Sequence, residues 1–306
     1  MRNEWFCIIN PTASKGKGAR EWPDIEQKLK DKNIDFEYSF TRYPRHSEEI
    51  FKKASEEGYR KFVAVGGDGT ANELCNAIMN TKNPKDYLLT MIPVGTGNDW
   101  GKSVGILSND HAVETLKSGK IITQDVGKVT FRDGYNVEQS RYFLNVAGIG
   151  FDAYVTNRAN KFSKLFRGTI SYLLPLLLTI ITYRSRKVEI ICDDHHKICR
   201  LFTMAVGIGK YNGGGMQLLP NASFNDGLFD VTVVRDISNL RVLLNVHLVY
   251  NGKILRHPKV DGYRAKKVKI KSLDRKLPIE ADGEFLGYLP CEFEIFENAL
   301  NILVKR

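Results

Sequence analysis

The feature that most constrains the fold is an apolar segment followed at once by a glycine turn and a helix-like segment. Residues 62–65 are consecutive apolar residues, which is typical of a strand buried on both faces in a parallel sheet. Glycines in the turn at 66–69 let the backbone bend sharply and approach a ligand with no side chain in the way. Residues 71–80 predict a helix with Leu74 and Ile78 on one face. This arrangement aims backbone N–H groups at an anion, usually a phosphate.

The same turn carries a carboxylate, Asp68, which indicates a metal ion or a reacting hydroxyl next to the phosphate. We therefore interpret this region as a phosphoryl-transfer site. A P-loop fold is disfavoured, because the polar glycine and lysine loop at 12–18 lacks the GxxxxGK[ST] pattern.

The first part of the chain alternates between predicted strands and helices, which favours an α/β domain with a parallel sheet. Three strands end in polar glycine turns, at 12–18, 66–70 and 95–99. Ligands of such sheets bind beyond the carboxyl ends of the strands. The predicted strands are residues 5–9, 36–40, 62–65 and 88–92, and the predicted helices are residues 20–30, 46–58 and 71–80.

The pattern changes near Asp125, after which most segments are strands separated by turn residues. We expect a second domain that is an antiparallel β-sandwich or barrel, with helical exceptions at 161–182 and 240–250. The predicted domains are 1–124 and 125–306, and the sequence leaves open whether the last strand returns to the first domain. The predicted strands are residues 128–131, 142–147, 187–192, 197–206, 229–234, 266–271, 277–281, 291–295 and 300–304.

The charge of the chain restricts its partners only loosely. A formal net charge of +10 on 306 residues favours anionic partners, but the basic residues are scattered and a solvated basic surface explains them equally well.

The apolar run at 170–181 is shorter than the roughly 20 residues that span a bilayer, and Pro175 interrupts it. The first residues lack the apolar run of a signal peptide. We expect a cytoplasmic protein, with peripheral contact at the inner face of a membrane left open.

The glycine turn belongs to a longer set of motifs. GGDGTANE at 66–73 resembles the GGDGTxNE signature of the diacylglycerol-kinase type of lipid kinases. GGDGT alone is a weak signal, because NAD kinases and phosphofructokinases carry similar turns. Further blocks, before and after this turn, occur in the same order as in the family and extend over nearly the whole chain. These blocks are residues 10–11, 95–99, 145–152, 212–216, 220–222, 226–231 and 282–284.

The resemblance implies an α/β domain with a parallel sheet, like that of NAD kinases and diacylglycerol kinases, followed by an antiparallel β-sandwich domain. It also implies ATP- and Mg²⁺-dependent phosphorylation of a lipid hydroxyl, most simply diacylglycerol to phosphatidic acid in phospholipid biosynthesis. Backbone N–H groups and hydroxyls would hold the nucleotide. The nucleotide contacts that the resemblance implies are Thr41, Gly66, Gly67, Asp68, Gly69, Thr70, Ala71, Asn72 and Thr96.

The resemblance assigns roles to four carboxylates. Asp68 would act through the catalytic Mg²⁺, and Asp99 and Asp125 match positions joined to its water network. From the residues alone, Asp68 and Asp99 also suit helix N-caps or turns. Glu284 matches the general base of the family, which accepts the proton of the lipid hydroxyl during attack on the γ-phosphorus. Spacing alone would make Glu284 a solvated residue after an Asp-Gly hairpin turn.

A structural Mg²⁺ is also implied, held by the carboxylate of Asp226 and the carbonyl groups of Ser223 and Leu228. An Asp-Gly turn without a metal explains the same residues.

Three lysines lie at or near positions where the family often has a basic residue, whose positive charge neutralises phosphate: Lys15, Lys102 and Lys164. Lys17 fits as well as Lys15, because the loop at 12–18 aligns loosely. Surface lysines are the alternative for all three.

The acceptor remains open at the level of sequence. A sphingoid-base or ceramide kinase shares the same blocks, and a more distant alternative is an NAD-kinase-like enzyme with a soluble acceptor. A nucleotide-binding regulator without catalysis is disfavoured, because Asp68, Asp99 and Glu284 are all present. The expected partners are the lipid substrate and, briefly, an anionic membrane surface, with no nucleic acid and with a homodimer left open. The run at 170–181 fits a buried packing helix, an acyl-chain wall or a membrane contact.

Overall fold

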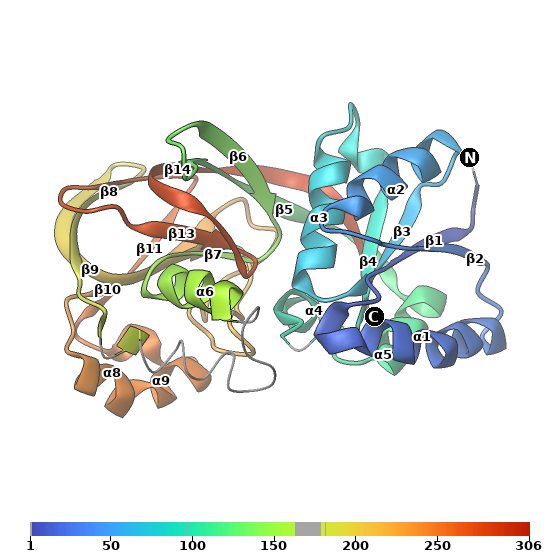
Figure 1. Ribbon diagram of the computed structural model, residues 1–306, viewed down its shortest axis with the longest axis horizontal. Helices are drawn as coiled ribbons and strands as arrows, with labels where there is room; N and C mark the ends of the chain where they lie inside the picture. The colour runs from blue at the N-terminus through green and yellow to red at the C-terminus, as the bar shows by residue number, and fades with distance from the viewer. Residues whose placement is uncertain (1, 96, 163–178, 181) are drawn as a thin grey trace. The chain divides into compact units, whose positions relative to one another are not determined.

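The computed structural model describes residues 2–95, 97–162, 179, 180 and 182–306, with the backbone alone for 159–162. Its chain divides into two compact units, whose elements Figure 1 labels. Unit 1 comprises residues 1–126, 213–215 and 296–306, and unit 2 comprises residues 127–212 and 216–295.

Unit 1 is built on strands that pair in parallel. β1 (Trp5–Ile9) lies between β2 (Phe36–Phe40) and β3 (Lys61–Gly66), and β3 pairs with β4 (Leu88–Pro93). The last part of β14 (Glu284–Val304) pairs in parallel with β4, Asn301 opposite Leu88, so the end of the chain belongs to this sheet. β3 and β4 are almost wholly buried, as expected for strands covered on both faces.

Helices connect these strands and cover the sheet. In Figure 1, α2 and α3 lie on one face of the sheet, and α1 and α5 lie on the other. Near its start α1 has left-handed backbone at Ser14, Lys15 and Gly16, so the polar residues at 12–18 form a bend rather than regular helix. The helices are α1 (Ala13–Asp31), α2 (His46–Glu56), α3 (Asp68–Met79), the 3₁₀ turn η1 (Pro84–Asp86), α4 (Asp99–Ser103) and α5 (Asn109–Ser118).

Unit 2 is β-rich, and its antiparallel strands form a closed circuit. β9 pairs with β7, β7 with β13, β13 with β14, β14 with β12, β12 with β8, and β8 again with β9. β10 and β11 extend this sheet from β9, and β5 pairs with β6. The strands are β5 (Lys120–Arg132), β6 (Glu138–Phe143), β7 (Val146–Gly150), β8 (Arg186–Cys192), β9 (His195–Gly207), β10 (Phe229–Arg235), β11 (Val260–Ala265), β12 (Lys267–Ser272) and β13 (Pro278–Ala281).

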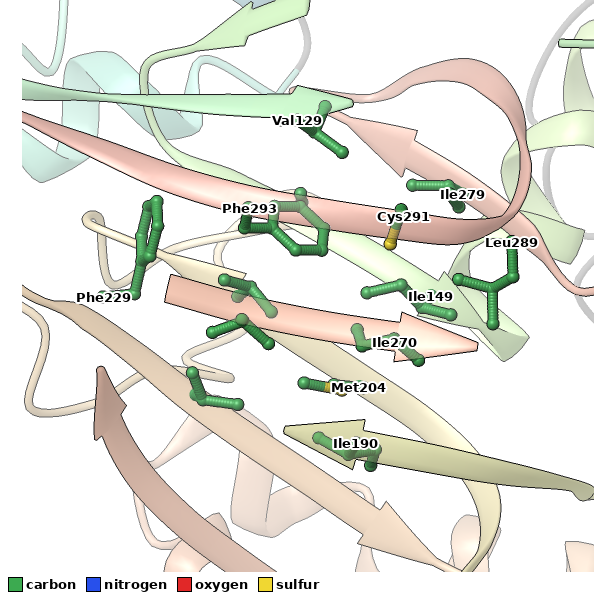
Figure 2. Close-up of a cluster of buried hydrophobic side chains, with 14 of the residues drawn as sticks. Val129, Ile149, Ile190, Met204, Phe229, Ile270, Ile279, Leu289, Cys291 and Phe293 are labelled. Carbon is green, nitrogen blue, oxygen red and sulfur yellow. The ribbon is translucent and has the colours of Figure 1, made fainter. Parts of the chain in front are cut away.

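The circuit encloses the core of unit 2. Side chains alternate along each strand, so β12 turns Val268 and Ile270 inward while its lysines stay exposed. Figure 2 shows Ile270 among Met204, Phe293 and other apolar side chains from neighbouring strands. The helices of this unit are α6 (Phe151–Phe162), α8 (Asn239–Asn245), α9 (His247–Tyr250) and the 3₁₀ turn η2 (Ile254–Arg256).

The structure corrects several predicted boundaries in unit 2. The single strand predicted at 142–147 is two strands, because the carboxylate of Asp282 accepts the N–H groups of Leu144 and Asn145 between them. The strand predicted at 266–271 is preceded by β11, and Asp193 binds the N–H groups of Lys266 and Lys267 where the two meet.

Two further predictions also need correction. The strands predicted at 291–295 and 300–304 are one strand, β14, with a left-handed residue at Asn298. α6 runs from Phe151 to Phe162 and so overlaps only the first residues of the helix predicted at 161–182; most of that predicted helix, with residues 170–178 and 181 of the apolar run, lies outside the described residues. No helix in the described part of the chain is both long and apolar enough to cross a bilayer.

Candidate phosphoryl-transfer site

Two glycine turns of unit 1 pack directly against each other. A Cβ atom on Gly95 would lie 2.7 Å from Cα of Gly67 and 2.5 Å from Oδ1 of Asn98. A Cβ atom on Gly66 would lie 2.3 Å from Oγ1 of Thr70. No larger residue fits at either position without moving its neighbours, so Gly95 is needed for packing between the turns and Gly66 for packing against the Thr70 side chain.

Asp68 joins the two turns through its carboxylate. Its Oδ1 accepts a hydrogen bond from the N–H of Trp100 at 2.9 Å, and its Oδ2 accepts one from the N–H of Asp99 at 3.1 Å. Burial raises the pKa of Asp68 above its ordinary value, and these two N–H groups oppose the rise. Asp68 therefore caps the first turn of α4 from the turn that begins α3.

Asp99 connects this pair of turns to a third segment. It is buried, and its Oδ1 accepts from Nζ of Lys102 at 3.0 Å. Its Oδ2 accepts from the N–H of Gly214 at 2.7 Å. Segment 213–215, remote in sequence, thus completes the surroundings of the two aspartates within unit 1. The sequence assigned no role to Gly214.

The start of α3 is suited to an anion. Its N-cap, Gly67, has no side chain to satisfy the first N–H groups of the helix. Thr70 and Asn72, predicted to contact nucleotide, are buried. Thr70 Oγ1 accepts from Asn10 Nδ2 at 3.4 Å, and Oδ1 of Asn72 accepts from the side chain of Asn76 at 3.1 Å. The Thr70 side chain thus links the start of α3 to Asn10, and the Asn72 side chain bonds within α3.

The other predicted nucleotide contacts are more dispersed. Thr41 follows β2, and its N–H donates to the carbonyl group of Ile9 at 2.8 Å, which fixes the end of that strand. Ala71 is buried in α3. Thr96 lies outside the described residues.

The two aspartates fit a hydrated Mg²⁺ better than direct coordination. All four of their carboxylate oxygens already accept one hydrogen bond each, from N–H groups or from Lys102. Each oxygen keeps a second lone pair for a metal-bound water, and carboxylates suit Mg²⁺, which retains several waters. A Cβ atom on Gly97 would lie 3.2 Å from Oδ2 of Asp68, so glycine keeps this side open.

Asp125 is placed differently. Its Oδ1 accepts the N–H of Asn298 at 2.7 Å, at the left-handed residue of β14, and its side chain is fully buried. No group of three His, Cys, Asp or Glu residues with metal-binding geometry occurs among the described residues.

The predicted lysines differ in their surroundings. Lys102 is tied to Asp99. Lys15 is exposed on the left-handed bend of α1, whereas Lys17 pairs with Glu21 at 3.2 Å. This contrast favours Lys15 over Lys17 as a mobile cation. Lys164 lies outside the described residues.

The turn before Glu284, in unit 2, is held by hydrogen bonds to two acidic side chains. Asp282, in left-handed conformation, accepts N–H groups of Leu144, Asn145 and Val146 at 2.7, 3.0 and 3.2 Å. Glu280 accepts the N–H of Gly283 at 2.9 Å. Glu284 itself is partly exposed, with Oε2 3.6 Å from a guanidinium nitrogen of Arg141.

Two further acids of unit 2, the buried Glu280 and the half-buried Asp152, had no predicted role. Glu280 and Asp152 both lie against Gly148, where a Cβ atom would be 2.5 Å from Oε1 of Glu280 and 3.2 Å from Cβ of Asp152. Burial raises the pKa of Glu280 to about 8, and the negative charge of Asp152 adds to the rise. Burial raises the pKa of Asp152 to about 6. The available signal was a carboxylate beside apolar residues in each segment, Asp152 after Phe151 and Glu280 between Ile279 and Ala281.

Glu73, the last residue of the glycine-turn motif, has a structural position. It accepts hydrogen bonds from the N–H of Arg45, at 3.0 Å, and from the hydroxyl of Ser47. Glu73 thereby fixes the start of α2, whose N-cap residue, Arg45, is left-handed and has no capping side chain of its own.

The predicted structural metal site holds an ion pair. A guanidinium nitrogen of Arg264 donates to Oδ2 of Asp226, and the N–H of Leu228 donates to Oδ1 at 3.2 Å. Ser223 donates its hydroxyl to the side chain of Asn225 at 3.3 Å. A cation already neutralises Asp226, so Mg²⁺ at this position would have to share its carboxylate with Arg264.

Comparisons with known proteins agree with this geometry. Residues 4–129 match the family model described as "Diacylglycerol kinase catalytic domain", and residues 145–304 match "YegS C-terminal NAD kinase beta sandwich-like domain". A Bacillus subtilis (strain 168) protein named "Putative lipid kinase YtlR" is 30% identical, over 98% of this chain and 99% of its own length. A Staphylococcus carnosus (strain TM300) protein named "Diacylglycerol kinase" is 29% identical, over 96% of this chain and 92% of its own.

The fold is similar to that of solved structures. One, titled as a crystal structure of a diacylglycerol kinase from Bacillus anthracis strain Sterne, superposes with a TM-score of 0.72 at 19% identity and covers 98% of this chain and 96% of its own.

Proposed function

Because this chain belongs to the diacylglycerol kinase family and is a lipid kinase, we propose that it transfers the γ-phosphoryl group of ATP, with Mg²⁺, to the hydroxyl of diacylglycerol. The product would be phosphatidic acid, an intermediate for phospholipid synthesis. The observation that carries this proposal is the packed pair of glycine turns, joined by Asp68 and Asp99, at the start of an uncapped helix.

In this proposal, unit 1 holds the nucleotide. The first N–H groups of α3 and the turn at 66–69 bind phosphate oxygens, and Thr41 and Thr96 complete the nucleotide contacts. Asp68, Asp99 and Asp125 are assigned to the water network of the metal. When bound in that network, Mg²⁺ would supply positive charge to offset the negative charge that develops on the phosphate during transfer. Lys15, Lys102 and Lys164 are assigned to further neutralisation of phosphate.

Glu284 is assigned the proton of the acceptor hydroxyl. Its carboxylate is partly exposed and lies on a turn fixed by Asp282 and Glu280, which supports a defined position for the base. In a loose phosphoryl-transfer transition state the proton leaves late, so an ordinary carboxylate serves as the acceptor. The proposed structural Mg²⁺ at Asp226, with the carbonyl groups of Ser223 and Leu228, has no part in this step.

The acceptor is tested by offering the protein several classes of alcohol. With γ-labelled ATP and Mg²⁺, we expect label in phosphatidic acid when diacylglycerol is supplied, and much less with sphingosine, ceramide, NAD or glycerol. Preferential labelling of sphingosine or ceramide would replace diacylglycerol as the acceptor, and labelling of NAD alone would contradict the lipid assignment.

We also propose that the enzyme works in the cytoplasm and contacts an anionic membrane surface during turnover. A lipid acceptor resides in the bilayer, and the net charge of +10 supports attraction to anionic lipid.

A further inference from the structure

The two short helices α8 and α9 of unit 2 expose a group of apolar side chains. We define the α8–α9 patch as the exposed side chains Leu240, Leu243, Leu244, Val246 and Tyr250. Leu240 is 67% exposed, Leu244 is 65% exposed and Tyr250 is 57% exposed. These five side chains lie within 11 consecutive residues, yet they are a third of the 15 large apolar side chains that are exposed in the described part of the chain.

The side chains of the α8–α9 patch are not the ones that attach these two helices to unit 2. Val242 and Val249 face the other way and pack against an apolar cluster of unit 2 that includes Phe202 and Leu219. Leu240, Leu243 and Leu244 are spaced as one outward face of α8. A surface helix normally carries polar and charged residues on its outward face. α8 instead carries leucines on its outward face, in addition to Val242 on its inward face. An exposed apolar group of this kind marks an interaction surface.

The charge around the patch indicates the chemistry of its partner. Residues 237–260 contain four Lys or Arg residues and two His residues and no Asp or Glu. The acids at the two ends of this stretch are already neutralised, since Asp236 lies 3.7 Å from Arg200 and Asp261 lies 2.7 Å from Lys197. Apolar side chains beside basic ones suit an anionic lipid surface, where the apolar side chains enter the interface and the basic ones meet headgroups.

We propose that the α8–α9 patch is the surface by which this kinase docks on an anionic phospholipid bilayer. Leu240, Leu243 and Leu244 insert at the boundary between headgroups and acyl chains, and Arg241 and Lys253 contact the phosphates. The inference deepens the proposed function, since it names the surface through which the enzyme reaches a substrate that lies in the membrane.

The test measures binding of the full chain to vesicles of phosphatidylglycerol and phosphatidylcholine, and to vesicles of phosphatidylcholine alone. We expect Leu240→Ser/Leu244→Ser to weaken binding to the anionic vesicles by at least about tenfold, because two leucine side chains no longer enter the interface. Arg241→Gln/Lys253→Gln should lower the binding to anionic vesicles and its dependence on salt.

The matched control is Tyr135→Ser/Val137→Ser. These side chains are 92% and 52% exposed in the turn between β5 and β6, at the opposite edge of unit 2 from α8 and α9 in Figure 1. This variant should bind vesicles as the wild type does. Wild-type binding by the double leucine variant, or equal binding of the wild type to both kinds of vesicle, would overturn the proposal. A double leucine variant that only loses self-association would overturn it too, in favour of a second copy of the chain.

A second readout separates this inference from the proposed acceptor. With short-chain diacylglycerol dispersed in detergent, the leucine variant should keep the wild-type rate, whereas with long-chain diacylglycerol in vesicles its rate should fall. If the wild type phosphorylates no diacylglycerol but the vesicle results hold, the proposed acceptor is wrong and the docking surface stands. If the wild type is active and the leucine variant matches it in both assays, the docking surface is wrong.

Discussion

Asp68 differs from an ordinary turn aspartate in what its carboxylate holds. It accepts the backbone N–H groups of two residues from another turn, Asp99 and Trp100, and one of these is itself a predicted metal-network residue. Removing its negative charge therefore affects both the shape of the site and the electrostatics toward Mg²⁺ and phosphate.

We expect Asp68→Asn to lower the rate of phosphoryl transfer by at least about 100-fold and the free energy of unfolding by about 1–3 kcal/mol. The amide of the new asparagine has only one oxygen, so its NH₂ group faces the N–H of Asp99 or of Trp100, which then lacks an acceptor. Asp133→Asn is the matched control, because Asp133 also accepts two backbone N–H groups, those of Tyr135 and Val137, each at 2.9 Å. Loss of activity in both variants would reduce the role of Asp68 to structure alone; the measurements are steady-state kinetics and urea unfolding.

The buried acid Glu280 makes a prediction about pH. Its pKa in the folded protein is about 8, above its ordinary value of 4.5, so between these two pH values the folded state holds a proton that the unfolded state has released. Because the folded state binds more protons, stability falls as pH rises through this window, by at most about 1.4 kcal/mol per pH unit.

Glu280→Gln removes this titration and keeps the size of the side chain. Urea unfolding at several pH values from 5 to about 8 should show the variant gaining stability relative to the wild type as pH rises. A difference between the two proteins that stays constant with pH would contradict a raised pKa at Glu280.

At the scale of elements, the site of unit 1 depends on two turns, one with Gly67 and one with Gly95, that pack so closely that no Cβ atom fits at Gly95. Gly95→Ala would bring a methyl group to 2.5 Å from Oδ1 of Asn98 and 2.7 Å from Cα of Gly67. Cα of Gly67 is backbone, and the Asn98 side chain is held by a hydrogen bond from its Nδ2 to the carbonyl group of Gly95 at 2.8 Å, so one turn must move.

We expect Gly95→Ala to lower the free energy of unfolding by about 1–3 kcal/mol and to weaken ATP binding, measured by calorimetry. Gly134→Ala is the control, since a Cβ atom on Gly134 meets nothing within 4 Å. Equal ATP affinity in the wild type and in Gly95→Ala would show that the turns can separate without affecting the nucleotide.

At the scale of the whole molecule, local sequence patterns predicted the strands and turns, whose formation depends on residues close together in the chain. The apolar run before the turn at 66–69 and the repeated strand–turn pattern indicated β3, β4 and the turns that follow them. A β-rich second part of the chain was also predicted from its pattern, and the structure confirms it.

Contacts between remote segments could not be predicted in this way. The hydrogen bond from Gly214 to Asp99 joins residues 115 positions apart, and that from Asn298 to Asp125 joins residues 173 positions apart. Neither leaves a periodic trace in the sequence. A buried acid such as Glu280 is likewise hidden, because its burial results from the closure of the strand circuit of unit 2.

The central claim is that unit 1 supplies nucleotide binding and that Glu284 supplies the proton acceptor. Glu284→Gln tests it most directly, with single-turnover transfer at saturating ATP measured beside the Kd for ATP in the presence of Mg²⁺. Glu138→Gln, which alters another glutamate of unit 2 near an arginine, is the matched control. We expect Glu284→Gln to keep the Kd within about threefold and to lose at least about 100-fold in transfer rate. Transfer at the wild-type rate by Glu284→Gln would contradict the account.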